Sequence, residues 1–322
     1  MVTGAGGFIG SHLCEALVGA GARVRALVRY TSSSARGHLD RLAPEVVGEI
    51  EVVAGDVQDA ACVRSLVRGA DAAFHLAALI GIPYSYVAPH QYVSTNIGGT
   101  LHMLEAVRET RVPRLVVTST SETYGTARYT PIDEAHPLQG QSPYSATKIG
   151  ADKLAESYFL SFGVPVATIR PFNTFGPRQS SRAIIPTIMK QLAAGREVIK
   201  LGNAAPVRDL CFVEDTVAGF LAVGASDRAL GQVINVGTGR GVSIGDLAQT
   251  IFQVTGKNAR IETDVARVRP EASEVMLLLA DARRARELCG WEARVTLEQG
   301  LARTWEYVLA HPEDYRVDEY SV

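Results

Sequence analysis

The sequence predicts an α/β fold, in which a Rossmann-type, doubly wound parallel sheet is followed by a smaller mixed α/β C-terminal lobe. Two observations support this prediction. Nearly all-apolar segments alternate with amphipathic segments through the first half of the chain, a pattern typical of a parallel sheet with helices on both faces. The first of these segments leads into a glycine-rich loop that opens a helix.

The individual elements follow from the spacing of apolar residues. In the first half, the predicted strands are 24–28, 50–55, 72–78, 114–119 and 164–170, and the predicted helices are 9–20, 60–68, 90–110 and 144–162. Beyond Pro171, we predict helices near 183–194, 214–225, 243–255 and 296–309, and strands near 197–201, 207–213 and 232–236. The first strand has only three residues before the glycines, so either native residues precede this numbering or the strand is unusually short.

Composition excludes several classes of function. The 322 residues are 47% hydrophobic and 20% charged, with a net charge of -2 and no basic block, which argues against binding to nucleic acid. No apolar segment is long enough to span a membrane, and no signal peptide is evident. The four cysteines have no metal-ligand or redox spacing and the seven histidines form no cluster, so we expect no metal and a reducing cytoplasm.

The loop "TGAGGFIG" predicts a dinucleotide cofactor. Glycines three residues apart allow a tight turn and let backbone N–H groups approach a pyrophosphate at a helix N-terminus. The strand before the loop and the helix after it make the pattern specific. The expected cofactor contacts here are Gly4, Gly7, Phe8, Ile9 and Gly10. We therefore expect a dinucleotide-binding domain over 1–170, with 207–236 returning to it, and a substrate-binding lobe formed by 171–206 and 237–322.

The end of the next strand indicates which dinucleotide is bound. An acidic residue at this point binds the ribose hydroxyls of NAD, but here the residue is Arg29, which suits the 2′-phosphate of NADP. The following "RYTSSSARG" adds Ser32, Ser33 and Arg36 as phosphate partners. We expect NADP as the cofactor, with NAD as the alternative. Asp56, after the third strand, is expected to bind the adenine amino group.

The segment "SPYSATK" predicts oxidation or reduction of an alcohol. Ser142 and Pro143 form a helix start, and Tyr144 and Lys148 then share one face of that helix. An ammonium group beside a phenol is expected to lower the phenol pKa from its usual value near 10. The resulting phenolate can take a proton from an alcohol while hydride leaves the same carbon.

Together these segments resemble the extended short-chain dehydrogenase/reductase family, which contains nucleotide-sugar epimerases and dehydratases. The resemblance covers essentially the whole chain and rests on "TGAGGFIG", "HLAA", "YSATK", "RPFNTFGPR", "VRDLCFVEDT" and "RPEASEV". It implies cofactor contacts from Val57, Leu76, Ala77, Ala78, Asn96, Thr118, Tyr144 and Lys148. It also implies substrate contacts from Ser85, Thr120, Asn173, Arg182, Arg208 and Arg269. Among these, Asn173 and Arg208 would touch the diphosphate or sugar and Arg269 would close over it.

The stretch "VVTSTSETYG" carries the residues that the resemblance implies for a dehydratase. Thr120 would contact the sugar C4 oxygen, and Glu122 would remove the C5 proton, which oxidation at C4 makes acidic. Ser121 stands where dTDP-glucose dehydratases have Asp and GDP-mannose dehydratases have Ser. Serine is a poor general acid, so Ser121 could orient water, or Glu122 could serve both steps. The resulting expectation is a nucleotide-sugar 4,6-dehydratase.

Other outcomes remain open at this point. UDP-glucuronate decarboxylases resemble the same strand end, a C4 epimerase would leave Glu122 incidental, and a dinucleotide sensor would turn nothing over. The segments 137–158 and 168–188 resemble bacterial dehydratases that act on nucleotide-linked N-acetylglucosamine, with UDP or GDP undecided. In relatives, two long helices such as 90–110 and 144–162 form a four-helix interface, so we expect a homodimer.

Overall fold

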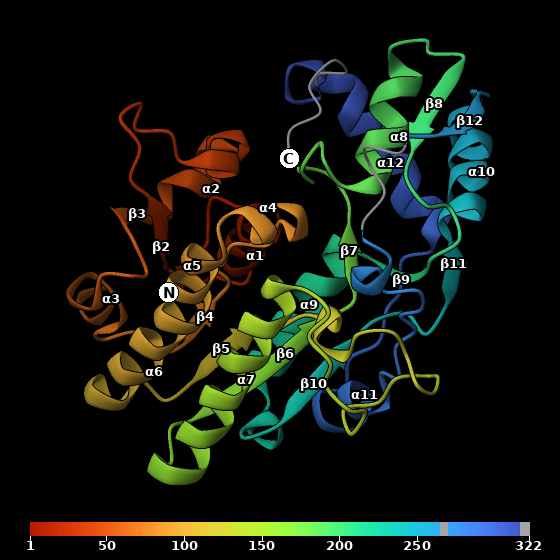
Figure 1. The fold of residues 1–322 in the computed structure, drawn as a ribbon. Helices are drawn as coiled ribbons and strands as arrows, with labels where there is room; N and C mark the ends of the chain where they lie inside the picture. Colours follow the sequence, from red (N-terminus) through yellow and green to blue (C-terminus); the bar gives the residue numbers. More distant parts are fainter. Residues whose placement is uncertain (265–269, 316–322) are drawn as a thin grey trace.

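The computed structural model describes residues 1–264 and 270–315, and its centre is a seven-stranded parallel sheet (Figure 1). The strands are β1 (Val2–Thr3), β2 (Val24–Arg29), β3 (Ile50–Gly55), β4 (Ala73–His75), β5 (Leu115–Thr118), β6 (Val166–Pro171) and β10 (Val233–Val236). Their order is β10-β6-β5-β4-β1-β2-β3, with all neighbours parallel. The order reverses between β1 and β4, which is where a doubly wound sheet binds its ligand. The predicted fold class is confirmed.

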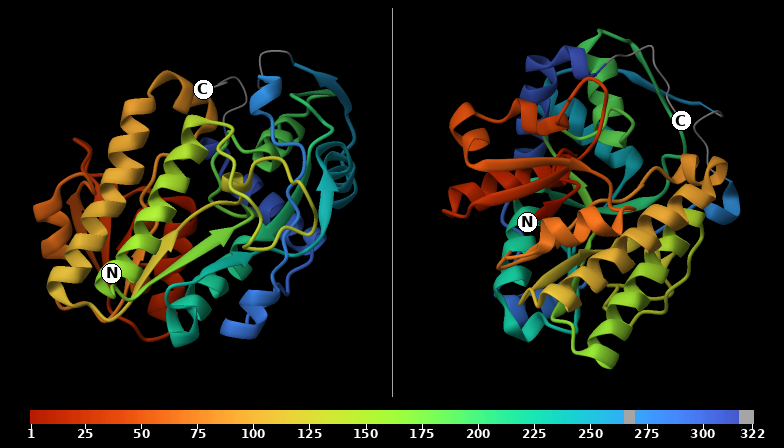
Figure 2. Two further views of the ribbon diagram at one scale, coloured as in Figure 1. Left: turned by 60° about the horizontal axis from the view of Figure 1, so that its bottom comes forward. Right: turned by 90° about the vertical axis from the view of Figure 1, so that its left-hand side faces the viewer.

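Helices cover both faces of this sheet (Figure 2). One layer contains α1 (Phe8–Gly19) and α9 (Val213–Ala225), and the other contains α3 (Ala60–Val67), α6 (Gly99–Thr110) and α7 (Pro143–Phe162). Strand β5 shows how the layers form, because side chains alternate between faces along a strand. Val116 joins the core that includes Leu13 of α1, whereas Leu115 and Val117 join the core beneath α3 and α6.

The predicted helix over 90–110 is three consecutive pieces in the structure. It consists of α5 (Pro89–Tyr92), a π-helical turn (Val93–Gly98) and α6. A π-helical turn is rare and is found most often at functional sites. Further short helices are α2 (Pro44–Gly48), α4 (Ile82–Val87) and the 3₁₀ turns Gly37–Arg41, Ser121–Tyr124, Asp227–Ala229, Glu271–Ser273 and Pro312–Asp314.

The second half of the chain forms the smaller mixed lobe. One sheet contains β7 (Asn173–Phe175), β9 (Val207–Phe212) and β11 (Gly241–Ser243), and another contains β8 (Val198–Leu201) and β12 (Arg260–Thr263). The helices are α8 (Ile184–Ala193), α10 (Ile244–Thr255), α11 (Arg283–Cys289) and α12 (Leu297–Ala310).

The segment 207–236 divides between the two parts of the fold. Strand β10 lies beside β6 in the large sheet, but β9 pairs with β7 and β11. The reason is the buried Asp209 of β9, whose carboxylate accepts the backbone N–H groups of Thr238, Gly239 and Ala280. These bonds hold β9 to the chain that follows β10.

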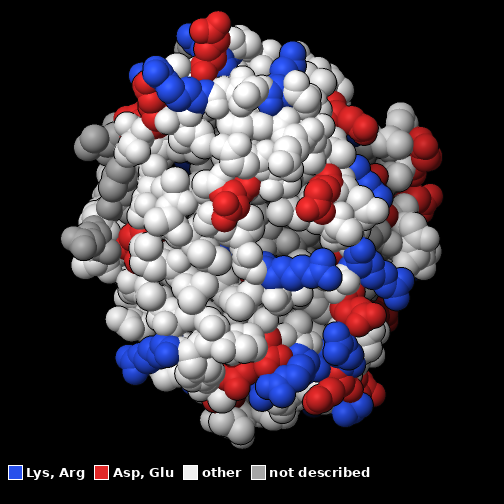
Figure 3. Space-filling model, turned by 90° about the vertical axis from the view of Figure 1, so that its right-hand side faces the viewer, with Lys and Arg blue, Asp and Glu red and all other residues white. Residues whose placement is uncertain are grey.

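The surface and the helices give no sign of a membrane-spanning or metal-binding segment among the described residues. None of their helices is long and apolar enough to cross a membrane, and none of their acidic, histidine or cysteine side chains gather in a group able to hold a metal ion. Figure 3 shows basic and acidic side chains interspersed over one face of the molecule, as a net charge of -2 would suggest.

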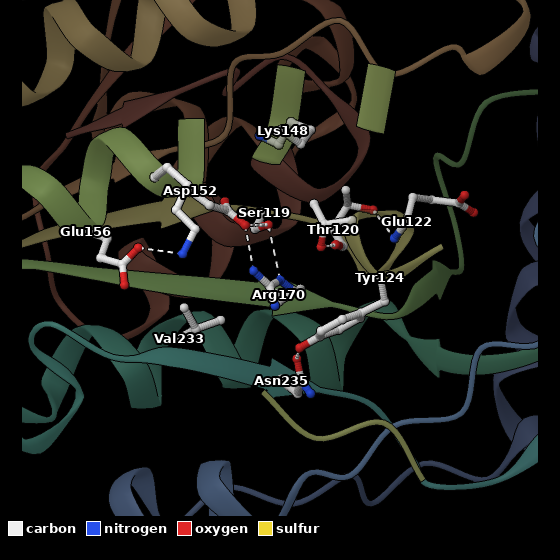
Figure 4. A network of polar contacts seen from close by, with 12 residues as sticks. Ser119, Thr120, Glu122, Tyr124, Lys148, Asp152, Glu156, Arg170, Val233 and Asn235 are labelled. Atoms are coloured by element: carbon white, nitrogen blue, oxygen red, sulfur yellow. Dashed lines mark hydrogen bonds and ion pairs between the residues drawn. The ribbon is translucent and has the colours of Figure 1, made fainter. Parts of the chain in front are cut away.

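A buried ion pair fixes helix α7 against the strands (Figure 4). Arg170 of β6 lies 2.6 Å from Asp152 of α7, and both side chains are at most 4% exposed. Ser119, which follows β5, donates its hydroxyl to the same Asp152 oxygen at 2.6 Å. The Arg170 guanidinium lies over the Tyr124 ring, and the Tyr124 hydroxyl donates to Asn235 of β10. One cluster therefore connects α7, β6, β10 and the chain after β5.

Replacing Asp152 should destabilise the fold strongly. Asp152→Ala leaves the buried Arg170 guanidinium without its counterion, which should lower the free energy of unfolding by about 3–5 kcal/mol. Chemical denaturation measures this change. Glu156→Ala is the matched control, since Glu156 lies one turn further along α7 in an exposed pair with Lys153 and should change stability by no more than about 0.5 kcal/mol. Similar small effects of both variants would contradict the importance of the buried pair.

Candidate active site

The glycine loop is packed so tightly that side chains cannot be accommodated. Gly4 has a φ of +67°, and a Cβ atom on it would lie 2.7 Å from the backbone nitrogen of Ala77. A Cβ atom on Gly10 would lie 2.1 Å from the Gly4 carbonyl oxygen. Gly7 is the exposed N-cap of α1. The loop thus leaves the N-terminus of α1 open to an anionic group, as predicted.

A hydroxyl that the sequence reasoning did not single out organises the neighbouring strand end. Thr3 Oγ1 accepts the backbone N–H groups of Leu76 and Ala77, both at 3.1 Å, and lies 2.8 Å from Nδ1 of His75. Burial and, to a smaller extent, the positive charge of Lys148 together lower the pKa of His75 to about 3. His75 is therefore a neutral imidazole. In the sequence, the polar His75 within the otherwise apolar segment "AAFHLAA" could have indicated this buried polar cluster.

Asn96 acts within the chain in this structure. Its side-chain oxygen accepts the N–H of Leu79 at 2.8 Å, and its amide nitrogen donates to the Leu79 carbonyl and to Thr147, both at 3.0 Å. Asn96 is 1% exposed and belongs to the π-helical turn. It therefore positions the chain that follows β4, where Leu76, Ala77 and the expected contact Ala78 lie.

Among the groups expected around the adenosine, Arg36 differs from the sequence interpretation because it is already paired with an acidic residue. Arg29 is exposed at the end of β2, and Ser32 is exposed beyond it. Arg36 is already engaged, because its Nε donates to Asp40 at 2.7 Å and its backbone N–H donates to the same carboxylate at 2.9 Å. Asp56 is half-buried and accepts the N–H of Gln58 at 2.9 Å, and Val57 is buried beside it. The sequence reasoning did not consider Asp40.

The proposed catalytic side chains meet where β5 ends and α7 begins. The Ser142 cap and Pro143 start α7 as predicted, and Tyr144 is buried on its first turn. Both Thr120 and Glu122 influence the pKa of the Tyr144 phenol, Thr120 lowering it and the charge of Glu122 raising it. Figure 4 shows Thr120 and Glu122 on the turn that follows β5. Ser121, between them, is buried.

The expected effect of Lys148 on Tyr144 is not present in this structure, and that expectation is wrong here. Burial raises the pKa of Tyr144 above its usual value, and Glu122 raises it further, while the Thr120 hydrogen bond opposes them. Lys148 instead donates to the backbone carbonyl of Thr118. Burial lowers the pKa of Lys148 to about 8, against the opposing charge of Asp152. The phenol is therefore neutral before any ligand binds.

The residues implied for substrate contact lie in different environments. Ser85 is buried and donates to the Ile82 carbonyl at 2.6 Å, so it supports α4. Arg208 is 9% exposed and lies 3.3 Å from Glu274. Arg182 is exposed, and its charge acts on Tyr92. Arg269 lies outside the described residues.

Two buried polar atoms fit a bound dinucleotide and a polar substrate. Thr118 Oγ1 and Asn173 Oδ1 are buried, and neither has a hydrogen-bond partner within residues 1–264 and 270–315. Buried polar groups are normally satisfied, so such atoms point to a partner supplied by a ligand. Thr118 was expected to touch the cofactor and Asn173 the substrate, and the glycine loop lies at the β1–β4 switch point of the same sheet.

Comparisons with known proteins agree with this arrangement. A family model described as GDP-mannose 4,6 dehydratase matches residues 1–304. The low-salt glycan biosynthesis protein Agl12 of Haloferax volcanii is 32% identical over 97% of this chain and 99% of its own. The structure of DesIV, a dTDP-glucose 4,6-dehydratase from Streptomyces venezuelae with NAD bound, is 27% identical with a TM-score of 0.87, covering 97% of both chains.

An epimerase is similar in structure to nearly the same degree. The structure of UDP-glucuronic acid 4-epimerase from Bacillus cereus, in complex with UDP-glucuronic acid and NAD, is 27% identical with a TM-score of 0.86, covering 95% of this chain and 98% of that one. The family-model match, the parallel sheet and the glycine loop all agree. The chain therefore belongs to the GDP-mannose 4,6 dehydratase family of the extended short-chain dehydrogenase/reductases, and it is an enzyme of the nucleotide-sugar dehydratase and epimerase type.

Proposed function

We propose that the protein is a nucleotide-sugar 4,6-dehydratase that acts on a nucleoside diphosphate hexose with a bound nicotinamide dinucleotide. The observation that carries the proposal is the carboxylate of Glu122, which lies on the 3₁₀ turn capped by Thr120 and whose charge acts on the Tyr144 phenol. An alcohol held by Tyr144 and Thr120 would place the next carbon of the sugar within reach of Glu122. That carbon is the one that must lose a proton before water leaves.

The roles of the side chains follow from their chemistry. The oxidised nicotinamide, when bound, supplies a hydride acceptor and a positive charge. Tyr144 takes the proton of the C4 hydroxyl, and because burial keeps this phenol neutral, it depends on nearby positive charge to ionise. Lys148, four residues along the same helix, carries one such charge at neutral pH. Thr120 holds the C4 oxygen.

Glu122 would then carry the elimination. It takes the C5 proton, which the neighbouring C4 ketone makes acidic. The leaving C6 hydroxyl needs a proton, and Glu122, once protonated, is the acid that can return it, because the neighbouring Ser121 is buried and has no acidic proton near neutrality. A single residue would thus serve both steps, with Ser121 orienting water or substrate. Return of the hydride to C6 and of a proton to C5 would then complete the reaction and restore the oxidised nicotinamide, so that the net change is loss of water.

The nucleotide and sugar belong to the same proposal. Asn173, Arg182 and Arg208 would bind the diphosphate and sugar, and Arg269 would close over them. The segments 137–158 and 168–188 support N-acetylglucosamine as the sugar, carried by UDP or GDP. NAD is the first cofactor to test, since the two similar structures have it bound, and NADP is the second.

Product masses test the reaction class directly. The protein is incubated with a panel of UDP-, GDP- and dTDP-hexoses, and each product is analysed by mass spectrometry. We expect loss of water from one of them. Loss of carbon dioxide from a uronic acid would instead identify a decarboxylase, and a change of configuration without a change of mass would identify an epimerase. Either result would overturn the dehydratase proposal.

Glu122→Gln should stop the reaction after the first hydride transfer. The amide keeps the shape of the side chain but cannot act as a base, so turnover should fall by about 10²–10⁴-fold. Oxidation at C4 depends on Tyr144 and Lys148 and should survive. The variant should therefore accumulate reduced nicotinamide, seen as new absorbance on mixing with substrate.

Tyr144→Phe is the matched control for this experiment. It removes the proton acceptor of the first step, so neither reduced nicotinamide nor product should form. Normal turnover of Glu122→Gln beside an inactive Tyr144→Phe would contradict the dehydratase proposal and favour an epimerase.

The same chain should form a symmetric homodimer through α6 and α7. Both views in Figure 2 show these helices side by side on one outer face, where Ile97 packs closely against Gly150. Val93 of the π-helical turn before α6 and Leu160 of α7 are 49% and 74% exposed, which is apolar surface that a second copy would cover. Light scattering measures the mass, and a monomer at micromolar concentration would contradict this arrangement.

A further inference from the structure

We propose that Asp40 selects NAD over NADP by holding Arg36 and by adding a negative charge where a ribose 2′-phosphate would need a positive one. This inference rests on the proposed cofactor site. Asp40 lies outside the end of β2, where the residue that distinguishes NAD from NADP is usually found.

The contact between the two residues is made at two points. The Arg36 Nε donates to one Asp40 oxygen at 2.7 Å, and the Arg36 backbone N–H donates to the other at 2.9 Å. Because main chain and side chain bind one carboxylate, the guanidinium is directed along the 3₁₀ turn Gly37–Arg41. The two side chains are 40% and 42% exposed, so solvent weakens the pair without removing it.

The backbone at Arg36, which begins the turn that carries Asp40, lies directly against the glycine loop. A Cβ atom on Gly6 would be 2.6 Å from the Arg36 carbonyl oxygen, and the His38 backbone N–H donates to the Gly6 carbonyl at 2.9 Å. Asp40 also lines a surface pocket together with Gly6, Gly37, His38, Arg41 and Asp314. Asp40 is therefore beside the part of the molecule where the cofactor would enter.

The other arginines near this pocket do not replace Arg36. Arg41 lies 2.9 Å from Glu313 and 2.7 Å from Asp314, so carboxylates of the C-terminal turn Pro312–Asp314 neutralise it. Arg29 is exposed at the end of β2, and no ion pair to its side chain is found within residues 1–264 and 270–315. Arg29 alone would have to balance a phosphate group of nearly two negative charges.

Asp40 carries its charge throughout the neutral pH range. Partial burial raises the pKa of its carboxyl group, but the hydrogen bonds from the Arg36 backbone and side chain outweigh burial and hold that pKa below its usual value. NAD has a neutral ribose hydroxyl at the position of the 2′-phosphate, and hydroxyls are compatible with a nearby carboxylate. Arg36, one of the two arginines that indicate NADP in the sequence, is thus opposed by an acid four residues further on.

Binding measurements on protein stripped of its nucleotide test this inference. NAD and NADP are titrated separately into the native protein and the Asp40→Asn variant by calorimetry. We expect the native protein to bind NAD more tightly. Asp40→Asn should raise the NADP affinity by about tenfold, because Arg36 is released and a repelling charge is lost, and should change the NAD affinity by less than about threefold.

Two further variants show whether Arg36 is the residue that responds. Arg36→Gln should leave the NADP affinity of the native protein nearly unchanged, whereas the Asp40→Asn, Arg36→Gln double variant should lose the gain. Glu109→Gln is the charge-matched control, since it removes one carboxylate from an exposed pair with Arg64 far along α6 and should alter neither affinity.

Three results would overturn the inference. These are an unchanged NADP affinity in Asp40→Asn, a gain that persists in the double variant, and an equal gain in Glu109→Gln. If none of the proteins binds either nucleotide, the cofactor site itself is wrong and the inference falls with it, so failure at that level is distinguishable from failure of the selection mechanism.

Discussion

The buried pair of Asp152 and Arg170 is the interaction on which the geometry of the site depends. Taking two charges out of water is costly, and an apolar pair of the same volume could give comparable stability. An apolar pair could not, however, form the hydrogen bonds that fix the orientation of α7. Asp152 also accepts the hydroxyl of Ser119, so α7, which carries Tyr144, is tied to the residue just before Thr120. The placement of Tyr144 relative to the turn that carries Thr120 and Glu122 is thereby fixed by hydrogen bonds and not by packing alone.

The cofactor half of the site depends on a different kind of constraint, which is close contact between backbones. Gly4 and Gly10 bring the first strand, α1 and the end of β4 together without side chains, and the Thr3 hydroxyl accepts the backbone N–H groups of Leu76 and Ala77 beyond that end. The two halves meet at Lys148. This residue extends from α7 to the carbonyl of Thr118, while its charge acts on His75 of β4.

The fold and the main parts of the site could be predicted from the sequence because they rest on local patterns. The glycine spacing, the Ser-Pro helix start and the alternation of strands and helices each report on a few neighbouring residues. What could not be predicted depends on pairs that are distant in the sequence or on competition between effects. The ion pair of Asp152 with Arg170 and the capture of Asp209 by residues after β10 need the tertiary structure. The neutral state of Tyr144 reflects burial, which raises the pKa of the phenol by more than its contact with Thr120 lowers it.

The neutral His75 has a consequence for experiments in solution. Its pKa is near 3, while that of Lys148 lies near 8, so neither group changes its charge appreciably between about pH 4 and pH 7. This side of the site therefore presents one nearly constant positive charge over that range. An inflection in a rate profile between mildly acidic and neutral pH would then report the ionisation of a group other than His75 or Lys148. The charges of His75 and Lys148 would stay the same while that other group titrates.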